Sequence, residues 1–242
     1  MAAAGRATTI RFVADGAAGP TPGLRERKKL RTRSTLVDVA AELCLRQGYD
    51  NTTVEQIAAT AEVSPRTFSR YFPTKDAVIG AIIEDVAQFI AAELARQPAG
   101  ITEYEALLRA HLAALRPGLD GVRTAIFHRM AALIQIVNSS AQLAMTSIPY
   151  RQDPSRFPTL VETARRMGLP PDHDAVLMVI ESWTSVMNTA TYGLGTPGQP
   201  PIEPDIICAR IKVAYEIFTR TWAPWIPVSQ TNGQPPAGAP QS

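Results

Sequence analysis

The segment Ser64–Tyr71, with the sequence SPRTFSRY, places basic and hydroxyl side chains at helical spacing. Ser64 can accept hydrogen bonds as a helix N-cap, and Pro65 suits the first helical position because an N–H there would have no partner within the helix. Phe68 and Phe72 recur four residues apart and therefore lie on one side of the predicted helix. We expect this aromatic side to be buried and the opposite side to be free for binding.

The free side carries groups that recognise nucleic acid. Arg66 and Arg70 lie opposite the aromatic residues, and arginine can form a bidentate pair with guanine. Thr67 offers a methyl group to thymine as well as a hydroxyl, whereas Tyr71 and Lys75 can reach phosphate oxygens. This mixture of side chains favours DNA over protein as the partner.

A second short helix is predicted immediately before this segment. Thr52 or Thr53 can serve as its N-cap, since each is followed three residues later by Glu55 or Gln56, the pair of a capping box. The apolar spacing that follows predicts a helix that ends near Thr60. Two short helices joined by a tight turn are typical of proteins that place the second helix in the major groove of DNA.

A strongly basic segment precedes both helices. Within nine residues one acid, Glu26, stands against six cations, which are Arg25, Arg27, Lys28, Lys29, Arg31 and Arg33. A helix is predicted from this segment to about Gln47, and its basic start suits contacts with phosphates. Residues 24–79 hold 10 Lys and Arg against 7 Asp and Glu, while residues 80–242 hold 12 against 14. The positive charge is thus concentrated beside the predicted groove-reading helix.

The run from Leu24 to about Ile83 resembles the N-terminal three-helix domain of the TetR (tetracycline repressor) family of transcriptional regulators. The resemblance rests on RQGYDNTTVEQIA, AEVSPRTFSRYF and PTKDAVI, and it covers roughly a quarter of the chain. It implies a three-helix DNA-binding domain with a helix-turn-helix, followed by a larger helical domain that binds an effector and dimerises. It also implies a homodimer that binds a double-stranded DNA operator through successive major grooves.

Carried onto this sequence, the resemblance assigns specific positions to the DNA contacts. The helix that begins at Thr53 joins the phosphate-binding groups, and the full expected set is Arg33, Thr53, Ser64, Pro65, Arg66, Thr67, Ser69, Arg70, Tyr71 and Lys75. Two features depart from the usual pattern. Glu62 occupies a turn position where the family commonly has glycine because a left-handed backbone is expected, and a non-glycine residue there costs about 1 kcal/mol. An extension of about twenty residues also precedes the basic helix.

Downstream of the DNA-binding segment, apolar residues recur at intervals of three and four, which predicts an all-α fold. Predicted helices cover residues 75–96, 103–116, 120–136, 139–147, 155–167, 172–192 and 205–222, separated by breaks that contain Pro or Gly. We expect a disordered extension over residues 1–23, the DNA-binding domain over 24–80, the effector-binding and dimerisation domain over 81–225, and a disordered tail over 226–242.

The predicted helices 172–192 and 205–222 carry apolar residues over much of their circumference. Such helices are buried on more than one side, either within the subunit or against a second copy, and the family resemblance favours a dimer interface of four helices. A small, apolar effector is expected in the same domain. Its candidate contacts, each of which is more often a plain core residue, are Phe127, Met130, Leu133, Ile134, Trp183, Met187 and Tyr192.

Other functional classes lack a signature in this sequence. No nucleophile elbow, phosphate-binding glycine loop or metal-ligand spacing occurs, so we expect no enzymatic activity, no cofactor and no metal. Cys44 and Cys208 are interpreted as reduced thiols rather than a disulfide. With no export signal and no long apolar run, the chain is expected to be cytoplasmic and not associated with a membrane.

The sequence therefore indicates a sequence-specific DNA-binding regulator, a repressor that a small effector releases from its operator. An activator with the same fold stays open, because activation uses the same operator contacts. A ligand-independent architectural protein that binds phosphates without base selection is a further alternative.

Overall fold

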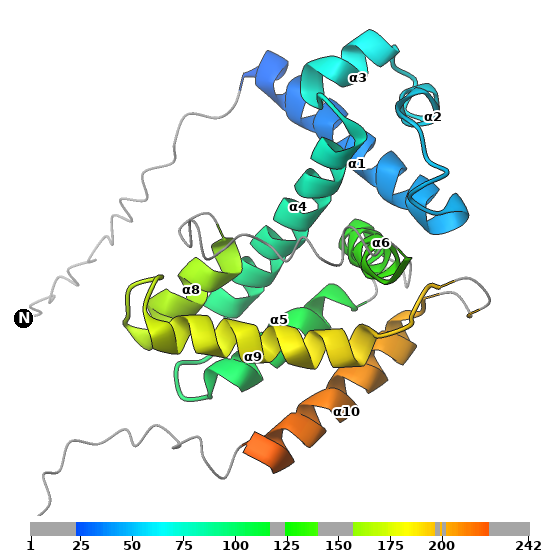
Figure 1. The fold of residues 1–242 in the computed structure, drawn as a ribbon. Coiled ribbons are helices and arrows are strands. Elements are labelled where there is room, and N and C mark those ends of the chain that lie inside the picture. The colour runs from blue at the N-terminus through cyan, green and yellow to red at the C-terminus, as the bar shows by residue number, and fades with distance from the viewer. Residues whose placement is uncertain (1–22, 117–123, 140–156, 197–198, 200–201, 223–242) are drawn as a thin grey trace, which may run out of the picture.

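The structure is a computed structural model that describes residues 23–116, 124–139, 157–196, 199 and 202–222. These residues form helices and no strand, which confirms the expected all-α fold (Figure 1). In chain order the helices are α1 (Leu24–Gln47), α2 (Val54–Thr60), α3 (Pro65–Tyr71), α4 (Lys75–Ala95), α5 (Glu103–Ala114), α6 (Ala125–Ser139), α8 (Pro158–Met167), α9 (Asp174–Thr191) and α10 (Pro204–Trp222).

Helices α1 to α3 and the start of α4 share a hydrophobic core. Leu36 of α1, Ile57 of α2 and Phe68 of α3 are fully buried in it. The expected capping box at the start of α2 is confirmed, because Gln56 N–H donates to Thr53 Oγ1 and Thr53 N–H donates to the Gln56 side chain. The reciprocal bonds satisfy two amides that the first turn of a helix leaves without partners.

Helix α4 runs from the N-terminal helices into the rest of the molecule (Figure 1). Its first half contributes Val78 and Ile82 to the N-terminal core, and its second half contributes Ile90 and Leu94 to a second core formed mainly with α5, α6, α9 and α10. A single continuous helix therefore connects the two cores.

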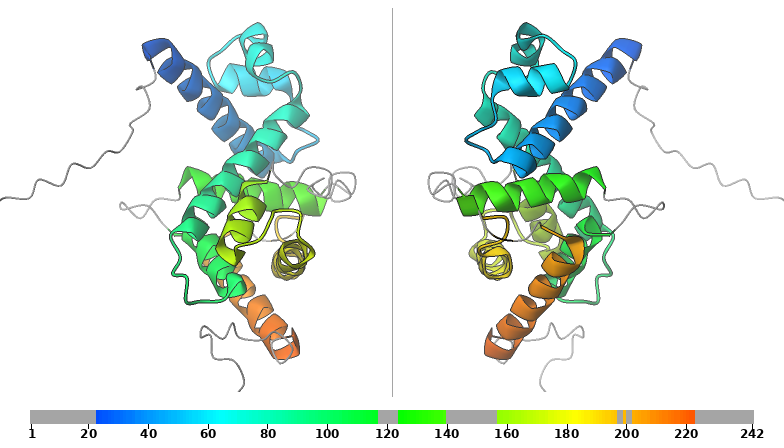
Figure 2. Two further views of the ribbon diagram at one scale, coloured as in Figure 1. Left: turned by 90° about the vertical axis from the view of Figure 1, so that its left-hand side faces the viewer. Right: turned by 90° about the vertical axis from the view of Figure 1, so that its right-hand side faces the viewer.

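Helix α6 lies between the N-terminal helices and the helices below it (Figure 2). Ala132 and Ile136 are buried in the N-terminal core, whereas Phe127 and Met130 are buried in the second core. Because opposite sides of α6 belong to different cores, a displacement of this helix would disturb both.

The predicted helix bounds agree with the structure to within a few residues where both are defined. The helix predicted over residues 120–136 begins at Ala125 and continues to Ser139 among the described residues. Helix α8 begins at Pro158, three residues later than predicted, in keeping with the preference of proline for the first helical turn. The helix predicted over 139–147 lies almost wholly outside the described residues, as do both predicted disordered ends except Gly23.

Two further features concern the described part of the chain. None of its helices combines the length and the apolar character needed to cross a membrane. Cys44 is buried and Cys208 is half-buried, and both are free thiols. Burial raises the pKa of the Cys44 thiol, so this group is protonated and inert near neutral pH.

Candidate nucleic-acid interface and effector cavity

Helix α3 is anchored by its aromatic side. Phe68 is fully buried and Phe72 nearly so, and their ring centroids lie 6.0 Å apart. Thr67 N–H donates to Ser64 Oγ at 3.1 Å, and Pro65 occupies the first helical position. The cap fixes where α3 begins and the aromatic pair fixes its rotation, as the sequence predicted.

The opposite side of α3 faces solvent. Its half-buried residues are Thr67 and Tyr71, and its exposed residues are Ser64, Pro65, Arg66, Ser69 and Arg70. Arg66 forms no hydrogen bond or ion pair with any residue that the structure describes. The Arg70 guanidinium carbon lies 5.4 Å from the centroid of the Tyr71 ring. An exposed guanidinium without a partner in its own subunit is available to an external one.

The turn between α2 and α3 has the left-handed backbone that the family resemblance implies at Glu62. Glu62 has a φ of 56°, in the left-handed region that favours glycine. Val63 N–H donates to Ala58 O at 2.9 Å and closes the turn despite this conformation. Glu62 is exposed, so its carboxylate lies in water rather than in the core.

Two residues of the expected DNA-binding set are engaged within the subunit. Arg33 lies 3.4 Å from an Asp85 carboxylate oxygen and 3.5 Å from one of Glu84. Lys75 donates to Tyr49 O at 2.9 Å, and its ammonium lies 3.9 Å from the centroid of the Tyr49 ring. Any phosphate contact of Arg33 or Lys75 would have to compete with these internal partners. Sequence spacing gave no sign of them because they lie 26 to 52 positions away.

The start of α1 carries exposed cations near α3. Arg25, Arg27, Lys28 and Arg31 are all exposed, and Lys29 is 3.8 Å from Glu26. The first turns of α1 and the whole of α3 lie at the same end of the molecule (Figures 1 and 2). This end therefore combines a positively charged helix start with the exposed donors of α3.

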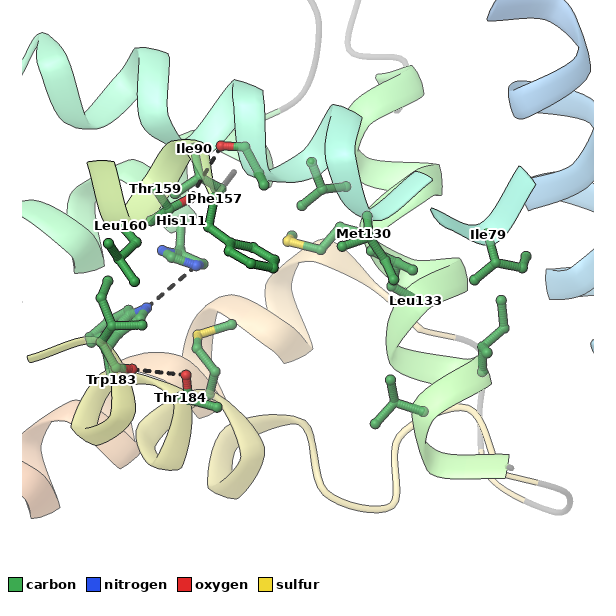
Figure 3. A pocket seen from close by; sticks show the side chains of 17 residues that line it. Ile79, Ile90, His111, Met130, Leu133, Phe157, Thr159, Leu160, Trp183 and Thr184 are labelled. Atoms are coloured by element: carbon green, nitrogen blue, oxygen red, sulfur yellow. Dashed lines mark hydrogen bonds between the residues drawn. The ribbon is translucent and has the colours of Figure 1, made fainter. Parts of the chain in front are cut away.

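A cavity of about 370 Å³ lies between α4, α5, α6, α8 and α9. Figure 3 shows side chains from these helices converging on it. Four of the predicted effector contacts, Met130, Leu133, Trp183 and Met187, line the cavity. A mostly apolar hollow of this size is suited to a small organic molecule.

The other three predicted contacts do not line this cavity. Phe127 and Ile134 are seven residues apart, which is about two helical turns, and both are buried in the second core instead. Tyr192 follows the end of α9 and is 79% exposed. Apolar character in the sequence could not separate cavity-lining residues from core residues on the same helix.

The polar residues of the cavity were missed by sequence reasoning. Thr159, Thr184 and His111 line it, although nothing in their local spacing marks them. His111 Nδ1 lies 2.8 Å from Leu107 O, and Trp183 Nε1 lies 3.4 Å from His111 Nε2 (Figure 3). Burial lowers the pKa of His111 to about 4, so the imidazole is neutral at pH 7.

Arg129 links the cavity helix to the N-terminal helices. This α6 residue contacts Asp38 of α1 through Nε at 2.9 Å and Asp85 of α4 through Nη1 at 3.0 Å. Its Nη2 also donates to Ser34 Oγ of α1 at 3.0 Å. The side chain is only 13% exposed, and the pairing compensates for the loss of water around its charge.

Comparisons with known proteins show what parts of the chain are similar to. Residues 36–82 match the family described as "Bacterial regulatory proteins, tetR family". A stretch of 118 residues, 47% of this chain, is 44% identical to the HTH-type transcriptional regulator TcmR of Streptomyces glaucescens. The match covers 52% of that protein, so the chain spans about half the length of this curated relative.

Solved structures of low identity also align with the chain. A tetR-family transcriptional regulator from Streptomyces coelicolor aligns with a TM-score of 0.47 and 18% identity, over 85% of each chain. A TetR family transcriptional regulator from Pseudomonas syringae aligns with a TM-score of 0.45 and 18% identity, over 78% of this chain and 95% of the other.

Proposed function

We propose that this chain, which belongs to the TetR family of bacterial regulatory proteins, is a sequence-specific DNA-binding transcriptional repressor. One observation carries the proposal. Helix α3 is held from inside by Phe68 and Phe72, while Arg66 and Arg70 face solvent without an acidic partner among the described residues. Such a helix can lie in the major groove and read base edges.

The proposed contacts divide into base-reading and phosphate-binding groups. Pro65, Arg66, Thr67 and Ser69 would face the bases from the exposed side of α3. The exposed cations at the start of α1, together with Thr53 and Tyr71, would bind phosphates. Arg70 packs on the ring of Tyr71 and would reinforce the phosphate contacts of α3.

In vitro selection from a pool of random DNA duplexes tests the proposal. We expect enrichment of an inverted repeat whose half-sites lie about one helical turn apart, because a symmetric dimer presents two recognition helices. Binding without enrichment, combined with a steep dependence on salt, would instead support an architectural protein that contacts phosphates only. A reporter gene under the selected site then separates repression from activation.

A homodimer formed through α9 and α10 is part of the proposal. These two helices expose large apolar side chains in the single subunit, including Met178 at 68%, Val213 at 55% and Ile217 at 56%. Trp222 at the end of α10 is 59% exposed. Apolar groups gathered on one pair of neighbouring helices are typical of a protein interface.

Sedimentation velocity of two variants tests the interface. Ile217→Glu should convert the dimer to monomer, because the new carboxylate would be buried without a partner in the interface. Val161→Glu on α8 is the matched control, since Val161 is also an exposed apolar residue but lies on another helix. Equal behaviour of both variants would contradict the assignment of the interface to α9 and α10.

Ligand control of DNA binding is proposed to act through α6. Met130 and Leu133 of α6 line the cavity, and Arg129 of the same helix holds Asp38 of α1 and Asp85 of α4. A ligand that displaces α6 would therefore change how α1 sits relative to α4. The effect on DNA affinity is limited by the difference in ligand affinity between the two arrangements.

A further inference from the structure

The two threonine hydroxyls among the described cavity residues donate hydrogen bonds to backbone carbonyls. Thr159 Oγ1 donates to Ala87 O at 3.2 Å, which joins α8 to α4. Thr184 Oγ1 donates to Ile180 O at 2.8 Å, one turn earlier in α9 (Figure 3). A hydroxyl has one hydrogen to donate and two lone pairs to accept with, so in this arrangement both oxygens, including that of the exposed Thr184, offer lone pairs to a ligand.

Among the described cavity residues, the two side chains that contain nitrogen are engaged in the same way. The Leu107 carbonyl can only accept, so the contact at 2.8 Å assigns the hydrogen of neutral His111 to Nδ1. His111 Nε2 then carries the lone pair that faces the Trp183 indole N–H at 3.4 Å. Both N–H groups are thereby directed at protein acceptors and away from a ligand.

The cavity also lacks a formal charge among its described residues. None of those that line it is Asp, Glu, Lys or Arg, and most are aliphatic or aromatic. A carboxylate or ammonium group would lose water there without gaining a countercharge, and this opposes its binding. The first turn of α8 has no side-chain cap, so its amides would favour an anion, but no described cation of the cavity accompanies them.

We propose that the cavity selects uncharged, largely apolar molecules that offer a hydrogen-bond donor to the Thr184 and Thr159 oxygens. The inference rests on the proposed role of the chain as a ligand-responsive regulator and specifies the chemistry of its ligand. A neutral molecule with a hydroxyl group pairs with the unused lone pairs, whereas an acceptor-only molecule finds the side-chain donors engaged. Thr184 and Thr159 are then specificity-determining residues.

Calorimetric titration with three naphthalenes of similar shape tests the proposal. The probes are 2-naphthol, which donates a hydrogen bond, 2-methoxynaphthalene, which only accepts, and 2-naphthoate, which is an anion. We expect 2-naphthol to bind about fivefold to tenfold tighter than 2-methoxynaphthalene, the effect of one net hydrogen bond. Binding of 2-naphthoate should be at least tenfold weaker than that of 2-naphthol.

A matched pair of variants locates the donor contact. Thr184→Val keeps the shape of the side chain and removes the oxygen. It should weaken the binding of 2-naphthol about fivefold and change the binding of 2-methoxynaphthalene by less than about twofold. Thr189→Val is the control, because Thr189 also donates to the carbonyl four residues earlier in α9 but does not line the cavity. Adding Thr159→Val to Thr184→Val should remove the preference for 2-naphthol altogether.

Three results would overturn the proposal. These are equal or tighter binding of 2-methoxynaphthalene, tighter binding of 2-naphthoate, and failure of 2-naphthol to bind up to its solubility limit. Because the titrations contain no DNA, they fail or succeed independently of operator binding. If the chain shows the expected ligand preference but binds no DNA duplex, the ligand site is supported and the proposed function is contradicted.

Discussion

Arg66 and Arg129 carry the same guanidinium group in opposite surroundings. Arg66 is exposed on α3 and has no partner among the described residues, whereas Arg129 on α6 is 13% exposed and contacts Asp38, Asp85 and Ser34. A buried guanidinium needs carboxylates because it has lost water, and an exposed one does not. The unpaired Arg66 is free for an external partner, which supports its proposed role in DNA binding, whereas the paired Arg129 joins three helices within the subunit.

The same contrast holds for the two sites as a whole. The exposed side of α3 presents hydrogen-bond donors and positive charge to the outside. The cavity presents apolar surface, and its polar side chains have directed their hydrogens at protein acceptors. The first arrangement suits a polyanion, and the second suits a neutral molecule.

The largest effect is expected from the inward side of α3. Phe68→Ala should lower the free energy of unfolding by about 3–5 kcal/mol, because it removes a fully buried aromatic ring. Urea denaturation followed by circular dichroism measures the loss. Arg66→Ala is the control and should change stability by less than about 0.5 kcal/mol. Comparable losses in both variants would break the distinction between the two sides of the helix.

The buried imidazole of the cavity should make stability depend on pH. The pKa of His111 is lowered from 6.5 to about 4 in the folded protein, so the unfolded chain binds more protons between these values. Stability should therefore fall as the pH drops from 6.5 to 4, by about 1.4 kcal/mol per pH unit. Denaturation at several pH values checks the slope. His111→Gln should reduce this slope by about 1.4 kcal/mol per pH unit, and an unchanged slope would contradict a buried, neutral imidazole.

The internal link should respond to loss of its arginine. Arg129→Ala should lower the free energy of unfolding by roughly 2–3 kcal/mol, because Asp85 is only 16% exposed and is left with a weaker partner. Arg109→Ala is the matched control: its pair with Glu105 lies within α5 and the two side chains are 45% and 38% exposed, so a loss below about 1 kcal/mol is expected. Thermal unfolding measures the melting temperature of each variant. Equal decreases in both would show that burial does not distinguish the two arginines.

The smallest effect is expected at the turn before α3. Glu62→Gly should raise the free energy of unfolding by about 0.5–1 kcal/mol, because glycine adopts the observed φ of 56° without strain. Ala61→Gly is the control, since Ala61 has a φ of −81° and gains nothing from glycine. A destabilised Glu62→Gly protein would show that the carboxylate has a favourable role that the turn geometry does not reveal.

The sequence predicted what depends on neighbours along the chain and missed what depends on packing. The caps at Thr53 and Ser64 and the burial of Phe68 follow from residues within four positions, and all are confirmed. The left-handed backbone at Glu62, which the family resemblance implies, is confirmed as well. The internal pairing of Arg33 and the contacts of Arg129 join residues 44 to 95 positions apart, which no local pattern encodes.

The cavity shows the same limit. Four of seven predicted apolar contacts line it, because hydrophobic spacing identifies buried faces without saying which ones leave space between them. Its polar groups, Thr159 and Thr184, come from helices whose proximity only the folded chain reveals. The sequence therefore predicts the local structure of α3, a single short helix, more completely than the lining of a cavity between five helices.

Fluorescence anisotropy on a selected duplex and on a scrambled one tests the central claim most directly. The account predicts that Arg66→Ala weakens binding to the selected duplex by about tenfold to a hundredfold and binding to the scrambled duplex only slightly. The preference for the selected duplex is then lost. Lys28→Ala, at the basic start of α1, should weaken both equally and reduce the salt slope by about one. Equal losses on both duplexes for Arg66→Ala would contradict the assignment of α3 as the helix that reads DNA.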